Sequence, residues 1–472
     1  MAYVGYVTVL KNVRKHSNAD RLQVGECFGN QVIVSLDYKE DQMGVYFPVD
    51  GQLSERFCQV NDLVRRKDEN GNACGGYLDP DKRNIKALRL RGEQSDGLFM
   101  PLTCLADFTK ISDLKEGDTI SVLNGEEICR KYIPRRNVAR TSGKSKSGKA
   151  KANFAPTFYE HIDTAQLAYN LGQFKVGDVV ELTLKMHGTS GRTGYLPLRK
   201  WKKSWLDKLL KRQGKEYREY GYVTGTRRVV LDDTHTGGFY SDNEFRHVMA
   251  AKFEGKLRKG EVVYYEIVGF VNESTPIMAS VKNSKISDKA FTKQYGPETV
   301  WSYGCDPCGG WESSVNMTEV PNEPIVETAP KCEVYVYRMI QVNEDGDVVE
   351  LSPDQVRMRC EQMGVKTVPV FERFIIPKTR LETQCHEDGS ENLFNVDVDP
   401  GEYVLRKVEE YFDGPDPIGK THVREGVVAR IVNRPNIAVY KHKNFSFKVL
   451  EGIAKDEAVA PDMEEAQEET AE

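Results

Sequence analysis

The residues best suited to chemistry lie in the segment 185–192, which reads KMHGTSGR. The run VGDVVELTL comes directly before it, and its apolar, β-branched residues predict a strand. Lys185 would then end the strand, and the small residues that follow would let a phosphate approach its amine closely. A neutral lysine amine is a nucleophile suited to covalent catalysis. The other interpretation is a salt-bridged surface lysine before a turn.

Further polar residues downstream lie on strand-like runs and could serve the same reaction. Glu266 lies in VVYYEIVGF and Glu425 in VREGVVAR, and carboxylates can hold Mg²⁺ directly or through its waters. Tyr337, in EVYVYRMI, can stack on a purine ring. Lys441 and Lys443, in VYKHKNFSFK, can lower the pKa of a nearby lysine and stabilise the charge that grows on a phosphate. Each glutamate taken alone could equally be a surface strand residue.

Six short patterns in this order resemble the motifs of the covalent nucleotidyltransferases, the superfamily of RNA ligases, DNA ligases and mRNA-capping enzymes. The series begins with Lys-x-(Asp/His/Asn)-Gly at Lys185 and includes TGTRRVV, an arginine-bearing motif, at residues 224–230. The resemblance implies that ATP and Mg²⁺ or Mn²⁺ bind here and that Lys185 becomes linked to AMP. It implies three sets of site residues: catalytic Lys185, Lys441 and Lys443; ATP-binding His187, Gly188, Arg192, Arg227, Tyr337 and Glu266; and metal-binding Glu266 and Glu425.

Within the superfamily, the chain is most similar to the RNA-ligase-2-related group with an N-terminal OB domain. His187 stands where DNA ligases normally have aspartate, and FAPTFYEHIDTAQL (154–167) resembles a stretch that precedes the lysine motif in such enzymes. DNA ligases and capping enzymes place an OB domain after the Lys-x-Lys motif, whereas an acidic tail follows it here. The resemblance implies an ATP-dependent RNA ligase that seals 3′-OH and 5′-phosphate RNA ends through lysyl-AMP and RNA-adenylate intermediates, in RNA repair.

Two other functions stay open on the sequence. A GTP-using capping-type nucleotidyltransferase would use the same lysine chemistry. A non-catalytic RNA- or tRNA-binding protein could carry an inactive copy of the same domain. For the ligase, the expected partner is RNA, either a nicked duplex or a broken structured RNA.

The strands and helices expected to position these residues indicate an α+β protein. Short strand-like runs fill the first 125 residues and indicate a small barrel, and KHSNADRLQVGEC and LRLRGEQSDGLFMPL resemble OB-fold signatures of tRNA-binding domains. We expect an OB-fold β-barrel at 1–128, a basic linker at 129–152, a nucleotidyltransferase domain of antiparallel sheets and helices at 153–452 with an insertion near 271–330, and an acidic disordered tail at 453–472.

The net charge of −5 hides an uneven distribution, because residues 451–472 carry nine acidic residues and one lysine. The remainder is therefore +3, with basic clusters at 130–151 and 198–218 that suit a phosphate backbone. Within the second cluster, Trp201 and Trp205 would share one face of a helix, either as core packing or as an RNA-stacking surface. Four arginines of the barrel and linker are expected to grip the RNA strand that supplies the 3′-OH: Arg89, Arg91, Arg135 and Arg136.

Other classes of protein are not indicated. The chain has no run of eighteen apolar residues and no signal-peptide pattern, so we expect a cytoplasmic protein without a membrane partner. Ten cysteines are ordinary for a reducing compartment. Cys305 and Cys308 could form half of a zinc site with Cys332 as a third ligand, but no fourth ligand follows at a suitable spacing.

Overall fold

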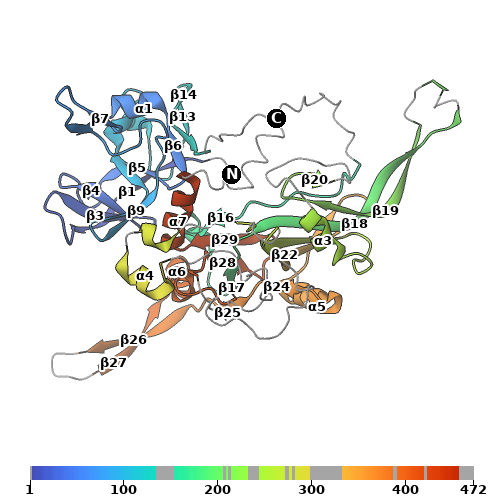
Figure 1. Cartoon of the computed structure of the whole chain (residues 1–472). Helices are drawn as coiled ribbons and strands as arrows, with labels where there is room; N and C mark the ends of the chain where they lie inside the picture. Colours follow the sequence, from blue (N-terminus) through green and yellow to red (C-terminus); the bar gives the residue numbers. More distant parts are fainter. Residues whose placement is uncertain are drawn as a thin grey trace, which may run out of the picture.

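A computed structural model describes residues 3–133, 154–205, 209–210, 214–231, 244–271, 276–278, 282–286, 288–297, 332–385, 391–418 and 422–456. Antiparallel sheets dominate it, with helices packed on their faces, and this confirms the predicted α+β fold. A strand-rich N-terminal domain, blue in Figure 1, lies beside a larger body built on two sheets. Among the described helices, none is both long and apolar enough to cross a membrane.

Where the sequence predicts an OB-fold barrel, the N-terminal domain consists of short antiparallel strands around an apolar core, and we call this domain the barrel. Its central strand β5 pairs with β1 on one side and β11 on the other, and Val45 and Phe47 on β5 are fully buried. The domain comprises β1 (Gly5–Val9), β2 (Lys11–Lys15), β3 (Leu22–Cys27), β4 (Asn30–Ser35), β5 (Met43–Phe47), β6 (Gly51–Leu53), α1 (Glu55–Val60), β7 (Arg65–Lys67), β8 (Ala73–Gly75), β9 (Ala87–Leu90), β10 (Glu93–Asp96), β11 (Leu98–Pro101), β12 (Thr119–Ile120), β13 (Val122–Leu123), β14 (Glu126–Glu127) and β15 (Cys129–Lys131).

The barrel is longer than the sequence predicted. Strand β15 pairs with β6, and the Tyr132 amide donates a hydrogen bond of 2.8 Å to the carbonyl of Asp50. The barrel therefore extends past the predicted boundary at residue 128. The basic segment 134–153, with Arg135 and Arg136, lies outside the described residues.

The first sheet of the body carries the lysine motifs. Its strand order is β16-β29-β28-β17-β25, and helix α6 covers one face by packing Val404 and Val408 against Val180 and Leu182. Asp399 caps α6 by accepting a hydrogen bond from the Glu402 amide. The elements are β16 (Ala165–Gln166), β17 (Val179–Lys185), β25 (Val370–Ile375), α6 (Pro400–Phe412), β28 (Gly426–Ile431) and β29 (Ala438–Lys443).

The second sheet carries Glu266 and Tyr337. Its strands run in the order β20-β19-β18-β21-β22-β23, with β24 added beside β22, and α3 and α5 bury Met249 and Cys360 against it. Figure 1 shows the β18–β19 hairpin and the separate β26–β27 hairpin extending from the body. The elements are β18 (Thr189–Lys202), β19 (Lys215–Gly225), β20 (Val230–Leu231), α3 (Glu244–Ala251), β21 (Glu261–Gly269), β22 (Cys332–Val342), β23 (Val348–Glu350), α5 (Pro353–Met363), β24 (Lys366–Thr367), β26 (Thr379–Cys385) and β27 (Glu391–Asp397).

Helix α7 (Phe445–Asp456) joins the barrel to the first sheet, and it appears in red between them in Figure 1. Its fully buried Phe447 and Leu450 belong to one apolar cluster with Ala87 of the barrel and Phe291 of α4 (Lys289–Tyr295). The predicted boundary at residue 452 thus falls inside a helix. The predicted insertion near 271–330 also contributes structure, because α4 packs in this interface.

Candidate active site

A cavity of about 350 Å³ lies between the two sheets of the body. Strands β17, β28 and β29 of the first sheet and β21 and β22 of the second contribute to its wall. This volume lies within the range typical of pockets for small molecules. Five of the predicted site residues line it: Lys185, Arg227, Glu266, Tyr337 and Lys441.

Strand register explains how three distant motifs meet beside the cavity. Lys185, the last residue of β17, pairs with Gly426 on β28, and Gly426 pairs with Lys443 on β29. Glu425 immediately precedes Gly426. A single row across three neighbouring strands therefore brings together residues that are about 240 and 18 positions apart in the sequence.

Two motif glycines are required because backbones approach closely. A Cβ at Gly188 would lie 2.4 Å from the carbonyl oxygen of Ile267 on β21. A Cβ at Gly426 would lie 2.1 Å from the carbonyl oxygen of His442 on β29. Side chains at these positions would push the lysine turn away from the second sheet and β28 away from β29.

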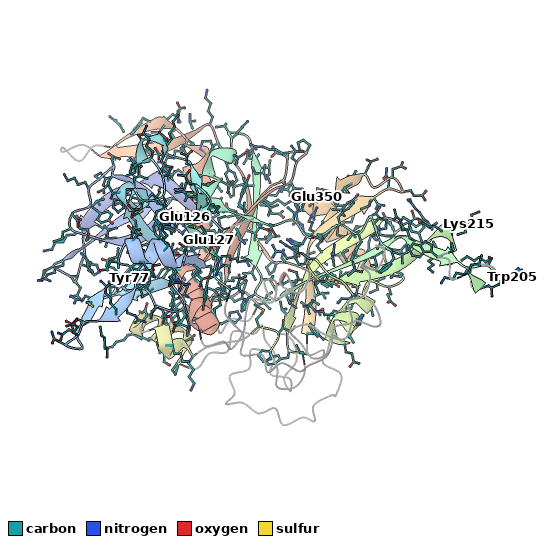
Figure 2. All side chains as sticks on the ribbon, turned by 90° about the horizontal axis from the view of Figure 1, so that it is seen from above. Tyr77, Glu126, Glu127, Trp205, Lys215 and Glu350 are labelled. Atoms are coloured by element: carbon teal, nitrogen blue, oxygen red, sulfur yellow. The ribbon has the colours of Figure 1, made fainter. Side chains whose placement is uncertain are left out.

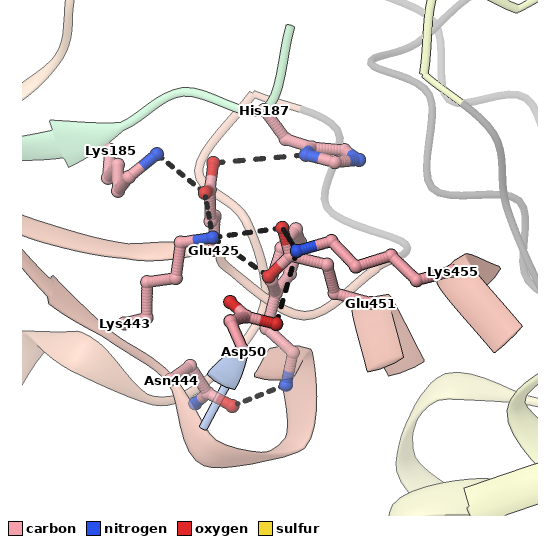
Figure 3. A network of polar contacts seen from close by, with 9 residues as sticks. Asp50, Lys185, His187, Glu425, Lys443, Asn444, Glu451 and Lys455 are labelled. Atoms are coloured by element: carbon pink, nitrogen blue, oxygen red, sulfur yellow. Dashed lines mark hydrogen bonds and ion pairs between the residues drawn. The ribbon is translucent and has the colours of Figure 1, made fainter. Parts of the chain in front are cut away.

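The charges around Lys185 alternate. Its Nζ donates a hydrogen bond of 2.5 Å to Oε1 of Glu425, and Nζ of Lys443 lies 3.4 Å from the same oxygen (Figure 3). Lys443 also donates to both carboxylate oxygens of Glu451 on α7, at 3.0 and 2.8 Å. Burial alone would lower the pKa of Lys443, but Glu451 and Glu425 outweigh it and raise that pKa well above its ordinary value. Lys443 is therefore a fixed positive charge.

The opposite wall holds the predicted base-stacking residue. Tyr337 lines the cavity with its ring 5.4 Å from that of His161, in an edge-to-face arrangement. Burial, followed by the charges of Arg227 and Arg338, lowers the pKa of His161 to about 3, so this ring is neutral at pH 7. Arg227 pairs with Asp163, which fixes its guanidinium at the cavity wall. An aromatic ring beside fixed cations suits a purine nucleotide.

Four predicted residues lie behind the wall instead of on it: His187, Gly188, Glu425 and Lys443. The His187 ring packs edge-on against Phe447, with centroids 4.8 Å apart. Burial lowers the pKa of His187 to about 4, so it is neutral at pH 7. Its position is that of a packed support for the lysine turn, and contact with a nucleotide in the cavity is not indicated by this geometry.

The surroundings of Arg192 differ from those expected of a phosphate or ribose ligand. It is 2% exposed, and its guanidinium donates to the carbonyl oxygens of Thr226, Phe158 and Arg228 at 2.9, 3.0 and 3.2 Å. The Phe158 ring also lies 4.3 Å from the guanidinium carbon. Arg192 thus ties the 154–163 segment to the Arg227 loop, and its donors point at backbone.

A divalent metal at this site would need carboxylate oxygens close to the cavity. Within the described ranges, no three His, Cys, Asp or Glu side chains cluster as a complete metal site. Glu425, however, has a buried Oε2 that makes no hydrogen bond in those ranges and lies 3.9 Å from Nδ1 of the neutral His187, and its other oxygen faces Lys185 (Figure 3). Mg²⁺ commonly uses one or two carboxylates together with substrate phosphates and water. Glu425 and the cavity-lining Glu266 fit that mode.

Comparison with known proteins decides the family. The family model described as RNA ligase matches residues 178–450, more than half of the chain. The chain belongs to the RNA ligase family. No curated protein matches it.

Among solved structures, three of the similar chains are forms of the Naegleria gruberi RNA ligase. A lysine-to-methionine mutant with AMP and Mn has a TM-score of 0.52 and 15% identity, covering 94% of this chain and 97% of that one. An arginine-to-alanine mutant with ATP and Mn gives 0.51 and 15%, covering 96% and 99%. The enzyme with PPi gives 0.50 and 14%, covering 97% and 99%. At these identities the likeness shows a shared fold.

Several residues of this RNA ligase site were not predicted from the sequence. Arg246 on α3 donates to the Ser190 carbonyl and the Thr189 hydroxyl, at 3.0 and 2.7 Å, and so holds the turn after Lys185. Arg430 on β28 donates to Glu350 of β23, which links the two sheets at the cavity. Glu451 lies inside the predicted nucleotidyltransferase domain but on no recognised motif. Only His161 had a signal, because it lies in the stretch that resembled other RNA ligases.

Two other predictions concern residues away from the cavity. Arg89, expected to grip RNA, instead pairs with Asp288 at 3.1 Å and lies over the Phe445 ring. It therefore helps to hold the barrel against α4 and α7. Arg91 is exposed on the barrel. Cys305 and Cys308 lie outside the described residues, whereas Cys332 is buried on β22.

Proposed function

We propose that this RNA ligase uses ATP and a divalent metal to seal 3′-OH and 5′-phosphate RNA ends. The observation that carries the proposal is Lys185 at a nucleotide-sized cavity, hydrogen-bonded to Glu425, with Lys441 on the same wall. The similar Naegleria structures hold ATP or AMP with Mn, which supports the same ligands here.

The reaction would proceed by three displacements at phosphorus. Nζ of Lys185 attacks the α-phosphate of ATP, an N–P bond forms and pyrophosphate leaves. The 5′-phosphate of RNA then takes the AMP from Lys185, and the 3′-OH of the other end displaces AMP as the phosphodiester forms. Lys185 must lose a proton before it attacks, and Oε1 of Glu425 at 2.5 Å is an acceptor in direct contact.

The chain's own residues would divide the remaining tasks. Tyr337 stacks on the adenine, Arg227 and Lys441 bind phosphate oxygens, and Lys443 sets the position of Glu425. Glu266 and Glu425 would hold Mg²⁺ or Mn²⁺, which neutralises charge on the triphosphate. Because reactive groups are fixed before the substrate arrives, little rearrangement is needed in the transition state.

The RNA substrate we propose is a nicked duplex or a broken structured RNA, as would arise in RNA repair. The basic segment 130–151 and the cluster at 198–218 supply the positive charge that such a backbone requires.

Incubation with radiolabelled ATP and Mg²⁺ tests the proposal. The wild-type protein should carry label through a denaturing gel, with the labelled peptide containing Lys185. Lys185→Ala should carry none, and Lys441→Ala should reduce labelling by at least ~100-fold, on the scale of losing one stabilising charge. Label on the Lys185 variant would exclude this lysine as the nucleophile.

A parallel incubation with radiolabelled GTP separates the capping-type alternative. Labelling by GTP and not ATP would favour a capping-type transferase. A folded wild-type protein that binds RNA and takes label from neither nucleotide would favour a non-catalytic binder.

A further inference from the structure

A row of alternating charges connects the barrel to the proposed nucleophile. Lys455 on α7 lies 3.1 Å from Oδ1 of Asp50 in the barrel and 3.8 Å from Oε1 of Glu451, four residues earlier on the same helix. Glu451 receives both hydrogen bonds from Lys443. Figure 3 shows this row running from Asp50 to Lys185.

The inner members of the row are withdrawn from water. The exposed fractions of the side chains are 5% for Lys455, 14% for Glu451 and 15% for Lys443, whereas Asp50 is 37% exposed. In such surroundings each charge is stabilised by its neighbour in the row, because removing one partner of a buried pair leaves an uncompensated charge. The position of Lys443 therefore depends on α7.

We propose that Glu451 positions Lys443 beside Glu425, and that Lys455 and the barrel residue Asp50 hold Glu451 in place. Glu451 and Lys455 are positioning residues, since neither lines the cavity. The proposal rests on the proposed role of Lys443 beside Glu425. It links the barrel to the active site through the contact between Asp50 and Lys455.

The chain contains its own control for this proposal. Lys448, also on α7, pairs with the barrel residue Asp96 at 2.6 Å, and both side chains are nearly buried. This second pair joins the same helix to the same barrel, and it has no contact with Lys443 in the described structure. Breaking it tests docking alone.

The experiment measures the single-turnover rate constant of lysine adenylylation in the full chain. Glu451→Gln should lower it by on the order of 10- to 100-fold, the effect of slightly misplaced catalytic groups, with the KM for ATP little changed. Lys455→Met and Asp50→Asn should lower it by progressively smaller factors, and Lys455→Arg should restore most of the rate. Asp96→Asn should lower the melting temperature and leave the rate constant unchanged.

Amide hydrogen exchange supplies a readout that does not require turnover. Glu451→Gln should speed exchange at residues 441–444, and Asp96→Asn should not. Glu451→Asp, which keeps the charge and shortens the side chain, replaces Glu451→Gln if that variant fails to fold. A wild-type rate constant and wild-type exchange in the folded Glu451 variant would overturn the proposal, as would an Asp96 variant as slow as the Asp50 variant. Absence of labelling in the wild type would instead contradict the proposed function.

The β18–β19 hairpin carries a second inference, which rests on the RNA substrate of the proposed function. Its outer part, residues 198–202 and 215–220, is here named the basic ribbon. Residues 215–219 are all exposed, so both faces of β19 are in water there. Figure 2 shows Trp205 and Lys215 at the end of the molecule opposite the barrel residue Tyr77.

Charges on the basic ribbon are only partly compensated within it. Arg199 and Lys200 pair with Glu216 and Glu219 of the facing strand, at 3.4 and 2.7 Å. Lys202, however, lies directly opposite Lys215, and Arg199 lies opposite Arg218. Like charges in such cross-strand pairs are destabilising. Over residues 199–219 the sequence has nine basic and three acidic residues. Trp205 at the end is 73% exposed, which leaves an aromatic face beside the cations.

We infer that the basic ribbon binds the phosphate backbone of RNA at a distance from the ends being joined. Phosphates would relieve the repulsion between the opposed cations, and an exposed tryptophan can stack on a base. From Ser190 at the cavity to Lys202 is twelve residues of β18, or roughly 40 Å at the usual rise of a strand. Only RNA arms of about that length would reach it.

The test measures the Kd for nicked RNA duplexes with long and short arms, without ATP. Lys202→Glu combined with Lys215→Glu should weaken binding of the long-armed RNA by about 10-fold and lower the salt slope by about 2, one for each lost phosphate contact. Binding of the short-armed RNA should be unchanged. Lys110→Glu with Lys115→Glu, on the exposed barrel surface, matches the change in net charge. Equal affinity of the ribbon variant and the wild type for the long-armed RNA would overturn the inference. A protein would then be the remaining partner for this surface.

Discussion

At the scale of single residues, the structure distinguishes side chains that face the cavity from side chains that hold the first set in position. Lys185, Lys441 and Tyr337 line the cavity, whereas Glu425 and Lys443 stand behind Lys185. All five lie on recognisable sequence motifs. A motif identifies residues that matter to a site, and geometry is needed to assign a contact with substrate.

Arg192 provides a prediction at this scale. Arg192→Met should lower the free energy of unfolding by roughly 2–4 kcal/mol, because three buried carbonyl groups lose their donors. Chemical denaturation checks the change. The folded fraction should still adenylylate Lys185, since this side chain does not line the cavity. A variant with wild-type stability and a greatly raised KM for ATP would restore the role predicted from the sequence.

At the scale of elements, antiparallel register positions the site, and two close backbone approaches maintain it. Gly426→Ala should separate β28 from β29, because the new Cβ would meet the His442 carbonyl at 2.1 Å. We expect loss of adenylylation together with a lower melting temperature, since the same strands hold Glu425 and Lys443. Gly452→Ala is the matched control, because a Cβ at this position on α7 meets nothing within 4 Å. Equal behaviour of the two variants would contradict the close-approach argument.

The sequence predicted where strands lie better than it predicted which segments they pair with. The strands at Lys185, Glu266 and Lys441 follow from apolar, β-branched runs, and the structure has β17, β21 and β29 there. Trp201, expected on a helix with Trp205, lies on β18, because cross-strand pairing with β19 extends the strand to Lys202. The residue pattern within one segment does not show which other segment it pairs with.

The same limit applies to α7. Its apolar face was not recognised as a domain contact, since Ala87 and Phe291 of distant segments complete the cluster. Lys455 falls within the predicted acidic tail and Glu451 just before it, and their partners Asp50 and Lys443 lie on other elements. A buried charge can be read from a sequence only when its counter-charge is close along the chain.

At the scale of the whole molecule, three histidines make stability depend on pH: His187 is buried, and His161 and His442 are partly buried. Burial is the largest cause in each case, and it lowers the pKa of His161 to about 3, of His187 to about 4 and of His442 to about 3. In the unfolded chain their pKa is about 6.5. Between pH 6.5 and 4 the unfolded state therefore binds more protons than the folded state, and stability falls as the pH falls.

Urea denaturation at pH 7, 6 and 5 measures this effect. Each histidine contributes at most about 1.4 kcal/mol per pH unit, so the free energy of unfolding should fall by up to about 4 kcal/mol per unit from all three. His442→Phe should reduce this slope by about a third while keeping a ring beside Phe412. A free energy of unfolding that is constant from pH 7 to 5 would contradict the neutral state of these rings.

The contact between Asp50 and Lys455 has a consequence for how the enzyme is made. These residues are 405 positions apart in the sequence, so the barrel has been synthesised long before its partner on α7 emerges from the ribosome. Domains generally fold as units during synthesis, beginning at the N-terminus. The barrel would then be folded before the strands of the two sheets pair. The surroundings of Lys185 become complete only when α7 arrives, so a nascent chain stays inactive until almost the last described residue has been translated.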